Sequence, residues 1–277
     1  MATTWRHRTS TRFEVRVQGE ENGIPFLWGH GLLTNMQAED ILDWFGWSDF
    51  PPSIKLIRYN ARGHGNGYAS IRATDFCWQS LALDLLQLAD QLGLGNLLAG
   101  GASMGASTAL YAALRAPQRV KGLVLVSPPT AWHRRSQQAS QYLRSAWLAL
   151  LLGGRGIAWL AARDLQRSLP GWMGYSQREK VKRTLPLLYR YRRLTLWAIF
   201  RGAALSNLPP KDRIRALAHI PTLILTWSDD PVHPVETAEE LHRLLPNSTL
   251  WVAENEEAFG EIPARMIEFI ERLQGID

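Results

Sequence analysis

Cysteine is nearly absent from this chain of 277 residues, in which Cys77 stands alone. A single cysteine excludes an internal disulfide and agrees with a reducing compartment. Because no motif surrounds Cys77, we interpret it as a core residue rather than as a nucleophile. The sequence also shows no metal-ligand cluster and no nucleotide-binding motif, so no cofactor and no metal are expected.

Long apolar runs are also scarce. The N-terminal residues 1–13 are basic but lack the apolar stretch of a secretory signal. The best candidate for a membrane span, residues 146–152, is too short and runs into Gly153-Gly154-Arg155. The sequence therefore predicts a cytoplasmic location and disfavours a membrane surface as a partner.

Acidic residues are few in one part of the chain. The net charge is +6, but residues 131–219 hold 17 Lys or Arg and 3 Asp or Glu, whereas the remainder holds 14 and 22. A basic segment on an acidic body can dock by charge complementarity, attract anionic substrates or form a solvated helical face. No nucleic-acid-binding motif accompanies the basic residues, so no nucleic-acid partner is expected.

The length and the apolar fraction of 46% suit one large α/β domain, or a domain with a substantial insertion. Short apolar runs predict strands at residues 13–18, 24–28, 54–59, 97–100, 123–126, 222–227 and 250–253. The first of these runs alternates in polarity, as a half-buried edge strand does. Helical patterns such as residues 74–92 separate the runs. This alternation predicts a doubly wound, mostly parallel sheet with helices on both sides.

The alternation stops at Ser127-Pro128-Pro129 and resumes at Ile220-Pro221. The sequence between these points has helical patterns and carries five of the twelve tryptophans. We therefore predict a core made of residues 1–128 and 220–277. Residues 129–219 are predicted to form a helical lid, or cap, over an apolar pocket.

The run Gly101-Ala102-Ser103-Met104-Gly105 fits the pattern G-x-S-x-G. A predicted strand precedes it and a run of helix-forming residues, 106–116, follows. Strand, tight turn and helix is the context of a nucleophile elbow, whose small residues allow the strand and helix backbones to approach closely. The alternative is a turn serine that caps a helix.

Together with this elbow, three further motifs in the same order resemble those of the α/β-hydrolase family, over nearly the whole chain. They are Trp28-Gly29-His30-Gly31-Leu32, Arg58-Tyr59-Asn60-Ala61-Arg62-Gly63-His64-Gly65 and Trp227-Ser228-Asp229-Asp230-Pro231-Val232-His233-Pro234. Asn60 stands where the family usually has Asp. The resemblance implies an α/β-hydrolase fold with Ser103 as the nucleophile. It also implies an oxyanion hole made by the backbone N–H groups of Leu32 and Met104, with His30 ordering the loop.

The acid and the base of the triad are less regular. Asp230 is the better candidate for the acid and Asp229 is the alternative, although either could cap the helix that begins near Val235. The resemblance places the catalytic histidine after the last strand, but Glu256 occupies that position. No histidine follows His242.

Three explanations of this departure are open. In the first explanation His233, three residues beyond Asp230, serves as the base. The alternative for His233 is that it only lines the pocket. Alternatively Glu256 serves as the base, alone or sharing a proton with Asp230. This requires strong desolvation, because a carboxylate with its normal pKa of about 4 is a poor partner for serine. In the third explanation the chain has the fold and lacks turnover.

The leading hypothesis is a serine hydrolase-like enzyme that cleaves a small or medium ester, thioester or lactone with an apolar acyl part. The tryptophans of the predicted lid motivate the apolar preference, and its arginines suit a substrate with an anionic group. The rival is a non-catalytic ligand-binding or scaffold protein disabled by Glu256.

A lid surface around residues 147–152, beside Arg144 and Arg155, has the composition to bind a membrane or another subunit. A lid helix packed on the core is the favoured interpretation there, and the oligomeric state is left open.

Overall fold

A computed structural model describes residues 6–7 and 13–273, so most of the basic N-terminal run lies outside the described residues. The described strands form one sheet in the order β1-β2-β4-β3-β5-β6-β7-β8. Their bounds are β1 (Arg6–His7), β2 (Val15–Gln18), β3 (Ile24–Gly29), β4 (Ile54–Tyr59), β5 (Leu97–Ala102), β6 (Val120–Val126), β7 (Thr222–Trp227) and β8 (Ser248–Ala253). Strands β3 to β8 pair in parallel, and the pairs β1–β2 and β2–β4 are antiparallel. The predicted mostly parallel α/β fold is confirmed. The prediction that β2 is an edge strand is wrong, because β1 pairs with its outer side.

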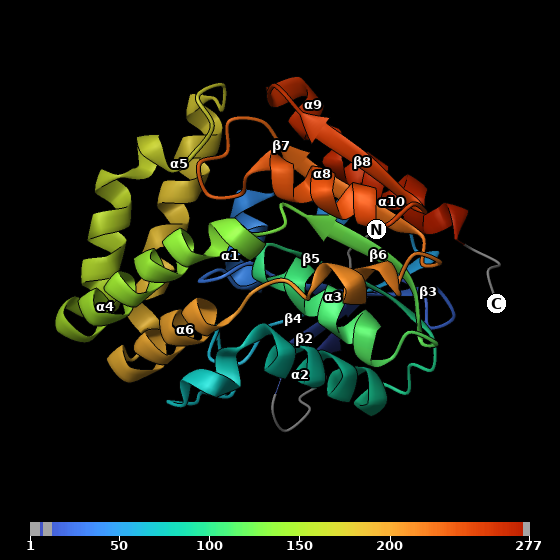
Figure 1. Cartoon of the computed structure of the whole chain (residues 1–277), viewed down its shortest axis with the longest axis horizontal. Helices are drawn as coiled ribbons and strands as arrows, with labels where there is room; N and C mark the ends of the chain where they lie inside the picture. Colours follow the sequence, from blue (N-terminus) through green and yellow to red (C-terminus); the bar gives the residue numbers. More distant parts are fainter. Residues whose placement is uncertain (1–5, 8–12, 274–277) are drawn as a thin grey trace.

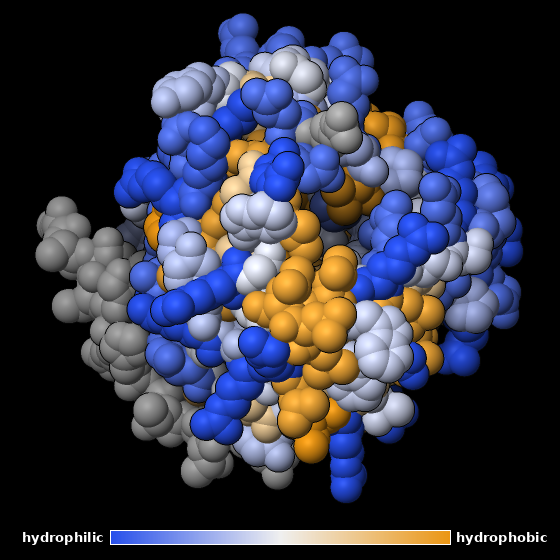
Figure 2. All heavy atoms as spheres, turned by 90° about the vertical axis from the view of Figure 1, so that its left-hand side faces the viewer, coloured by the Kyte–Doolittle hydropathy of each residue, from blue (hydrophilic) through white to orange (hydrophobic). Residues whose placement is uncertain are grey.

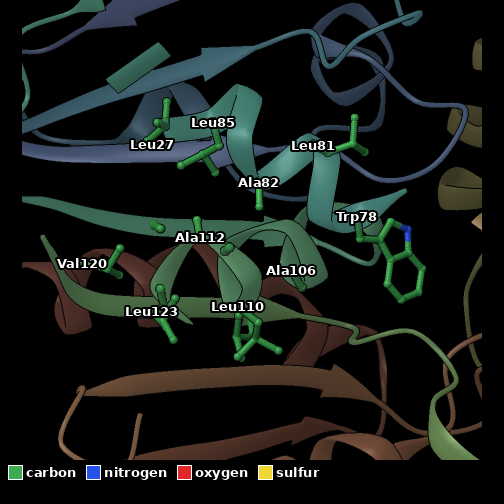
Figure 3. Close-up of a cluster of buried hydrophobic side chains, with 14 of the residues drawn as sticks. Leu27, Trp78, Leu81, Ala82, Leu85, Ala106, Leu110, Ala112, Val120 and Leu123 are labelled. Atoms are coloured by element: carbon green, nitrogen blue, oxygen red, sulfur yellow. The ribbon is translucent and has the colours of Figure 1, made fainter. Parts of the chain in front are cut away.

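Helices cover both faces of this sheet (Figure 1). They are α1 (Met36–Leu42), α2 (Trp78–Gln91), α3 (Met104–Arg115), α8 (Val235–Leu244), α9 (Glu256–Gly260) and α10 (Ile262–Arg272). Because successive side chains of a strand point to opposite faces, β3 sends Leu27 into a cluster with α2, α3 and α8. Its neighbours Phe26 and Trp28 enter a second cluster with α9 and α10. Figure 3 shows part of the first cluster, with Leu85 on α2 and Leu110 on α3.

The chain between β6 and β7 is helical. It contains α4 (Arg135–Arg163), α5 (Tyr175–Thr184), α6 (Arg193–Leu205), α7 (Lys211–Arg215) and short 3-10 turns, η3 (Trp132–Arg134), η4 (Leu165–Arg167) and η5 (Leu185–Arg190). Helices α4, α5 and α6 lie together on one side of the molecule (Figure 1). Buried Arg135 joins the start of this segment to its end, since its guanidinium donates to Thr130 O at 3.2 Å and to Ser206 O at 2.7 Å.

The helix formed by residues 132–163 changes one expectation. By length and composition it could cross a membrane, which corrects the prediction that no stretch reaches that length. A single helix of this kind is weak evidence, because the core helix of a soluble protein passes the same test. Moreover, Gly153 interrupts the helical geometry near the middle, with φ 65° and ψ −173°. We therefore describe α4 as two helical halves joined at Gly153.

Candidate active site

Ser103 occupies a sharp turn between β5 and α3. Its φ of 51° and ψ of −104° are unusual for a residue with a side chain, and its N–H donates to Val126 O at 2.9 Å. Glycines allow this turn: a Cβ added to Gly105 would lie 1.9 Å from Gly29 O, and one on Gly101 would lie 2.5 Å from the same oxygen. The predicted close approach of strand and helix is therefore present, and it presents Ser103 at the carboxyl end of β5.

A continuous hydrogen-bonded chain leads from Ser103 to His233 and Asp230. Ser103 Oγ lies 2.9 Å from His233 Nε2, and His233 Nδ1 lies 2.9 Å from Asp230 Oδ2. Because a carboxylate only accepts, Nδ1 carries the proton and the unprotonated Nε2 accepts from the serine hydroxyl. The other carboxylate oxygen, Oδ1, accepts from the N–H groups of Val232 at 2.8 Å and His233 at 3.0 Å. The arrangement is that of a nucleophile, a base and an orienting acid.

The electrostatics suit these roles. Burial alone would raise the pKa of Asp230, but the charge and hydrogen bond of His233 and the two backbone donors outweigh it and lower that pKa. Asp230 is therefore ionised at neutral pH. Its side chain is 5% exposed and that of His233 is 20% exposed, so the imidazole remains accessible.

Sheet topology explains why Ser103 meets His233, which lies 130 positions later in the chain. Ser103 follows β5 and Asp230 follows β7, with only β6 between the two parallel strands. Two strand spacings are about 10 Å, a gap that one imidazole with a hydrogen bond at each end fills. The loop after β7 is anchored from β6, since Thr130 Oγ1 donates to Val232 O at 3.1 Å.

Two buried histidines order the loop after β3. His30 Nδ1 donates to Gly31 O at 2.8 Å and its Nε2 accepts from Ala61 N at 3.0 Å. His64 Nδ1 donates to Arg62 O at 2.9 Å and its Nε2 accepts from Leu33 N at 3.3 Å. Burial lowers the pKa of His30 to about 3 and that of His64 to about 4, so both imidazoles are neutral at neutral pH. In each ring, one nitrogen donates a hydrogen bond and the other accepts one.

One expected oxyanion donor, Met104, follows the serine in the chain, and the other, Leu32, lies in the loop after β3. Met104 is the first residue of α3, so its N–H has no acceptor within the helix. Leu32 belongs to the loop held by His30, and a Cβ added to neighbouring Gly31 would lie 3.9 Å from Ser103 Cβ. Leu33 N and Thr34 N bond to His64 and Gly31, whereas no acceptor for Leu32 N is found among the described residues. Both N–H groups are thus available beside Ser103.

Comparison with known proteins agrees with this fold. A family model described as alpha/beta hydrolase fold matches residues 25–260. The chain belongs to the alpha/beta hydrolase fold family. It is 23% identical to a proline iminopeptidase of Neisseria gonorrhoeae over 262 residues, which cover 85% of this chain and 83% of the relative.

Solved structures of the family are also similar. A thermophilic esterase from Thermogutta terrifontis aligns with a TM-score of 0.69 and 21% identity, over 99% of this chain and 98% of that one. An enol-lactonase from Burkholderia xenovorans aligns with a TM-score of 0.69 and 17% identity, over 95% of each chain. These named relatives are an esterase, a lactonase and a peptidase, so the matches support a hydrolase in general and do not specify the bond cleaved.

Glu256 holds the position where the alpha/beta hydrolase pattern has its histidine, but the structure does not bring it to Ser103. β8 ends at Ala253 and α9 begins at Glu256, with the Asn255 side chain accepting from Ala258 N at 2.9 Å to cap the helix. The Glu256 side chain is exposed and lies against Gly174. Among the described residues, the hydrogen bonds of Ser103 Oγ and of Asp230 Oδ2 go to His233 and none goes to Glu256.

An aromatic cluster holds α9 in this place. Phe259 is buried, and its ring lies 5.1 Å from that of Trp227, 5.5 Å from that of Trp44 and 6.0 Å from that of Trp172. Trp172 also donates from Nε1 to Ser228 O at 3.2 Å.

The second acid candidate, Asp229, is the residue after Ser228, and it is exposed with φ 56°. Only Asp230 of the two faces the histidine.

Asn60 departs from the family pattern for a local reason. Its Oδ1 accepts from Met36 N at 2.8 Å and its Nδ2 donates to Glu14 Oε2 at 2.6 Å. An aspartate would present a second carboxylate to Glu14 and would lack the donor. Asn60 therefore joins β4 to α1 and to the chain before β2.

No group of three or more His, Cys, Asp or Glu side chains suited to a metal ion occurs among the residues that the structure describes.

Proposed function

We propose that the protein is a serine hydrolase that cleaves a small or medium ester, thioester or lactone with an apolar acyl part. Ser103 is the nucleophile, His233 the base and Asp230 the acid that orients the base. The observation that carries the proposal is the pair of 2.9 Å contacts from Ser103 Oγ to His233 and from His233 to Asp230.

The reaction follows from this geometry. Ser103 Oγ attacks the carbonyl carbon while its proton passes to His233 Nε2, and Asp230 stabilises the resulting imidazolium. The N–H groups of Leu32 and Met104 hold the oxyanion. When the tetrahedral intermediate collapses, the leaving group takes the proton from His233 and an acyl-serine ester remains. Water then gives a proton to His233 Nε2 while its oxygen attacks the ester carbonyl. When this second tetrahedral intermediate collapses, His233 returns the proton to Ser103 Oγ, which leaves as the free hydroxyl, and the carboxylic acid is released.

The helical segment of residues 129–219 supports the apolar preference, and we propose that it acts as the lid. Leu32 and Leu33 pack against a cluster that contains Ala146, Leu196 and Phe200 of α4 and α6. On the other side of the serine, Ala102 packs against the cluster that contains Met173. The position of Ser103 is thus flanked by apolar side chains of this segment, whose basic character suits a substrate with an anionic group.

The alternative, a non-catalytic ligand-binding or scaffold protein, rests on Glu256 in the histidine position. Because His233 is hydrogen-bonded to Ser103, the site has a base without Glu256. We therefore do not favour this alternative, and the following experiment separates the two.

The test is stoichiometric labelling by a fluorophosphonate, followed by intact-mass spectrometry. We expect one adduct per wild-type chain, none for Ser103→Ala, and labelling slowed by at least about 1,000-fold for His233→Ala, since a lost triad base costs several orders of magnitude. The matched control is His242→Ala, which removes an exposed histidine that contacts Ser248 and should label as the wild type does.

Two outcomes would contradict the proposal. If folded wild-type protein takes no label, the alternative of a binding protein is favoured. If His233→Ala labels as fast as the wild type while Ser103→Ala does not label, Ser103 is a nucleophile with another base. Circular dichroism of each variant establishes that the compared proteins are folded.

A further inference from the structure

The first half of α4 buries its small residues and exposes its large ones. Ala146 and Ala149 are fully buried, in a cluster that includes Leu196 and Phe200 of α6. On the opposite side, Trp147 is 63% exposed and Leu151 69% exposed. Ordinary surface helices turn their large apolar side chains toward the core. This helix therefore carries an apolar face that nothing in the described chain covers.

More apolar side chains gather where α4 is interrupted. At Gly153 the chain turns, and Arg193 at the start of α6 donates to Leu150 O at 3.0 Å and to Leu151 O at 2.9 Å. Leu194, the next residue, is 55% exposed. The contacts of Arg193 thus fix the start of α6 against the end of the first half of α4.

The second half of α4 extends this surface. Leu148 and Trp159 line one shallow groove, so the two halves of the helix lie side by side there. We name the whole surface the apolar apex. It consists of Leu143, Trp147, Leu148, Leu151, Leu152, Trp159, Tyr189 and Leu194, all of them exposed. Figure 2, which faces this side of the molecule, shows hydrophobic surface gathered between strongly hydrophilic side chains.

Arginines border the apolar apex. Arg144 and Arg155 are exposed on α4, with Arg155 stacked 5.7 Å from the Tyr189 ring, and Arg163 lies 4.6 Å from the Trp159 ring. The segment that carries the apex holds 17 basic and 3 acidic residues. Large apolar patches on a monomer mark interaction sites, and a basic border selects an anionic partner.

We propose that the apolar apex docks on the surface of a bilayer that contains anionic lipids. Tryptophans and leucines would enter the boundary between headgroups and acyl chains, and the arginines would meet the lipid phosphates. A second copy of this chain fits less well, because an isologous contact would bring two equally basic borders together. The proposal does not depend on the proposed catalytic function.

The test is co-sedimentation with vesicles of phosphatidylcholine alone and of phosphatidylcholine with 30% phosphatidylglycerol, a chosen composition within the anionic range that recruits basic surfaces. We expect binding of the full chain to the anionic vesicles at low salt, with partitioning at least about tenfold lower for neutral vesicles or in 0.5 M salt, because salt screens the attraction. The double substitution Trp147→Ser with Leu151→Ser should lower partitioning by at least about tenfold as well.

A matched control removes an exposed leucine elsewhere. Leu83 on α2 is 48% exposed and lies outside the apolar apex, so Leu83→Ser should bind vesicles as the wild type does. The proposal is overturned if the wild type binds neither vesicle composition, or if Leu83→Ser and the double variant bind equally. It is also overturned if sedimentation equilibrium shows a dimer that the double variant dissociates, since the apex would then be an interface between copies.

Discussion

At the scale of single residues, the candidate site shows which local geometries the sequence can predict. Ser103 could be predicted because its neighbours in the chain define the elbow. The choice between Asp229 and Asp230, and between His233 and Glu256, depends on how loops after β7 and β8 lie relative to β5. That is a three-dimensional property, so the sequence alone left these alternatives open. The structure brings Asp230 and His233 to Ser103 and leaves Asp229 and Glu256 exposed.

The position of Glu256 leads to a prediction about the base. Because Asn255 caps α9 and Glu256 lies against Gly174, a histidine introduced there would not reach Ser103. We expect Glu256→His and Glu256→Gln to change kcat for p-nitrophenyl butyrate by no more than about twofold, because neither alters a group that contacts the reacting atoms.

The comparison variant is His233→Gln, which should lower kcat by at least about 1,000-fold. A large gain of activity in Glu256→His would show instead that the site lacks a working base and that position 256 can supply one.

At the scale of elements, the order of strands and helices followed from the sequence more fully than the site did. The seven predicted strands all occur, because a buried parallel strand is a short run of apolar residues that is visible on its own. β1 was missed because it has only two residues, Arg6 and His7, and gives no periodicity. No helix was predicted over residues 256–260, where the structure has the capped helix α9 (Glu256–Gly260). Local chemistry, the Asn255 cap, determined the result.

The contact between α3 and β3 provides a prediction at this scale. A Cβ at position 105 would lie 1.9 Å from Gly29 O, so Gly105→Ala must push α3 away from the sheet. We expect the free energy of unfolding in urea to fall by about 1–3 kcal/mol or more, which is the usual cost of overpacking a core. We also expect fluorophosphonate labelling to slow by at least about tenfold.

Gly260 of α9 is the matched control, because a Cβ added there meets nothing within 4 Å. Gly260→Ala should leave stability unchanged or raise it slightly, since alanine favours a helix over glycine. Equal effects of the two substitutions would argue that helix propensity, and not the close approach at the elbow, explains the result.

At the scale of the whole molecule, buried ionisable groups couple the stability of the fold to pH in opposite directions. His30 and His64 have pKa values of about 3 and about 4 in the folded state, lowered chiefly by burial from 6.5. The unfolded chain therefore binds protons at these residues first, and their contribution to stability is lost as pH falls below 6.5. Glu39 acts oppositely. Burial raises its pKa to about 7 and outweighs the charge of Arg58, which lowers it, so the folded state takes up the proton first as pH falls.

The contribution of one histidine can be isolated by comparing variants. We predict that the urea-unfolding free energy of the wild type, relative to that of His64→Gln, falls by roughly 2 kcal/mol between pH 7.5 and pH 5. Glutamine does not titrate, and the subtraction cancels Glu39 and every other group common to both proteins.

The exposed His219 supplies the control, because His219→Gln should follow the wild type at both pH values. A difference between wild type and His64→Gln that is independent of pH would mean that His64 is not held neutral in the folded protein. Its hydrogen bond to Leu33 N would then not explain how the loop beside Ser103 keeps its shape near neutral pH.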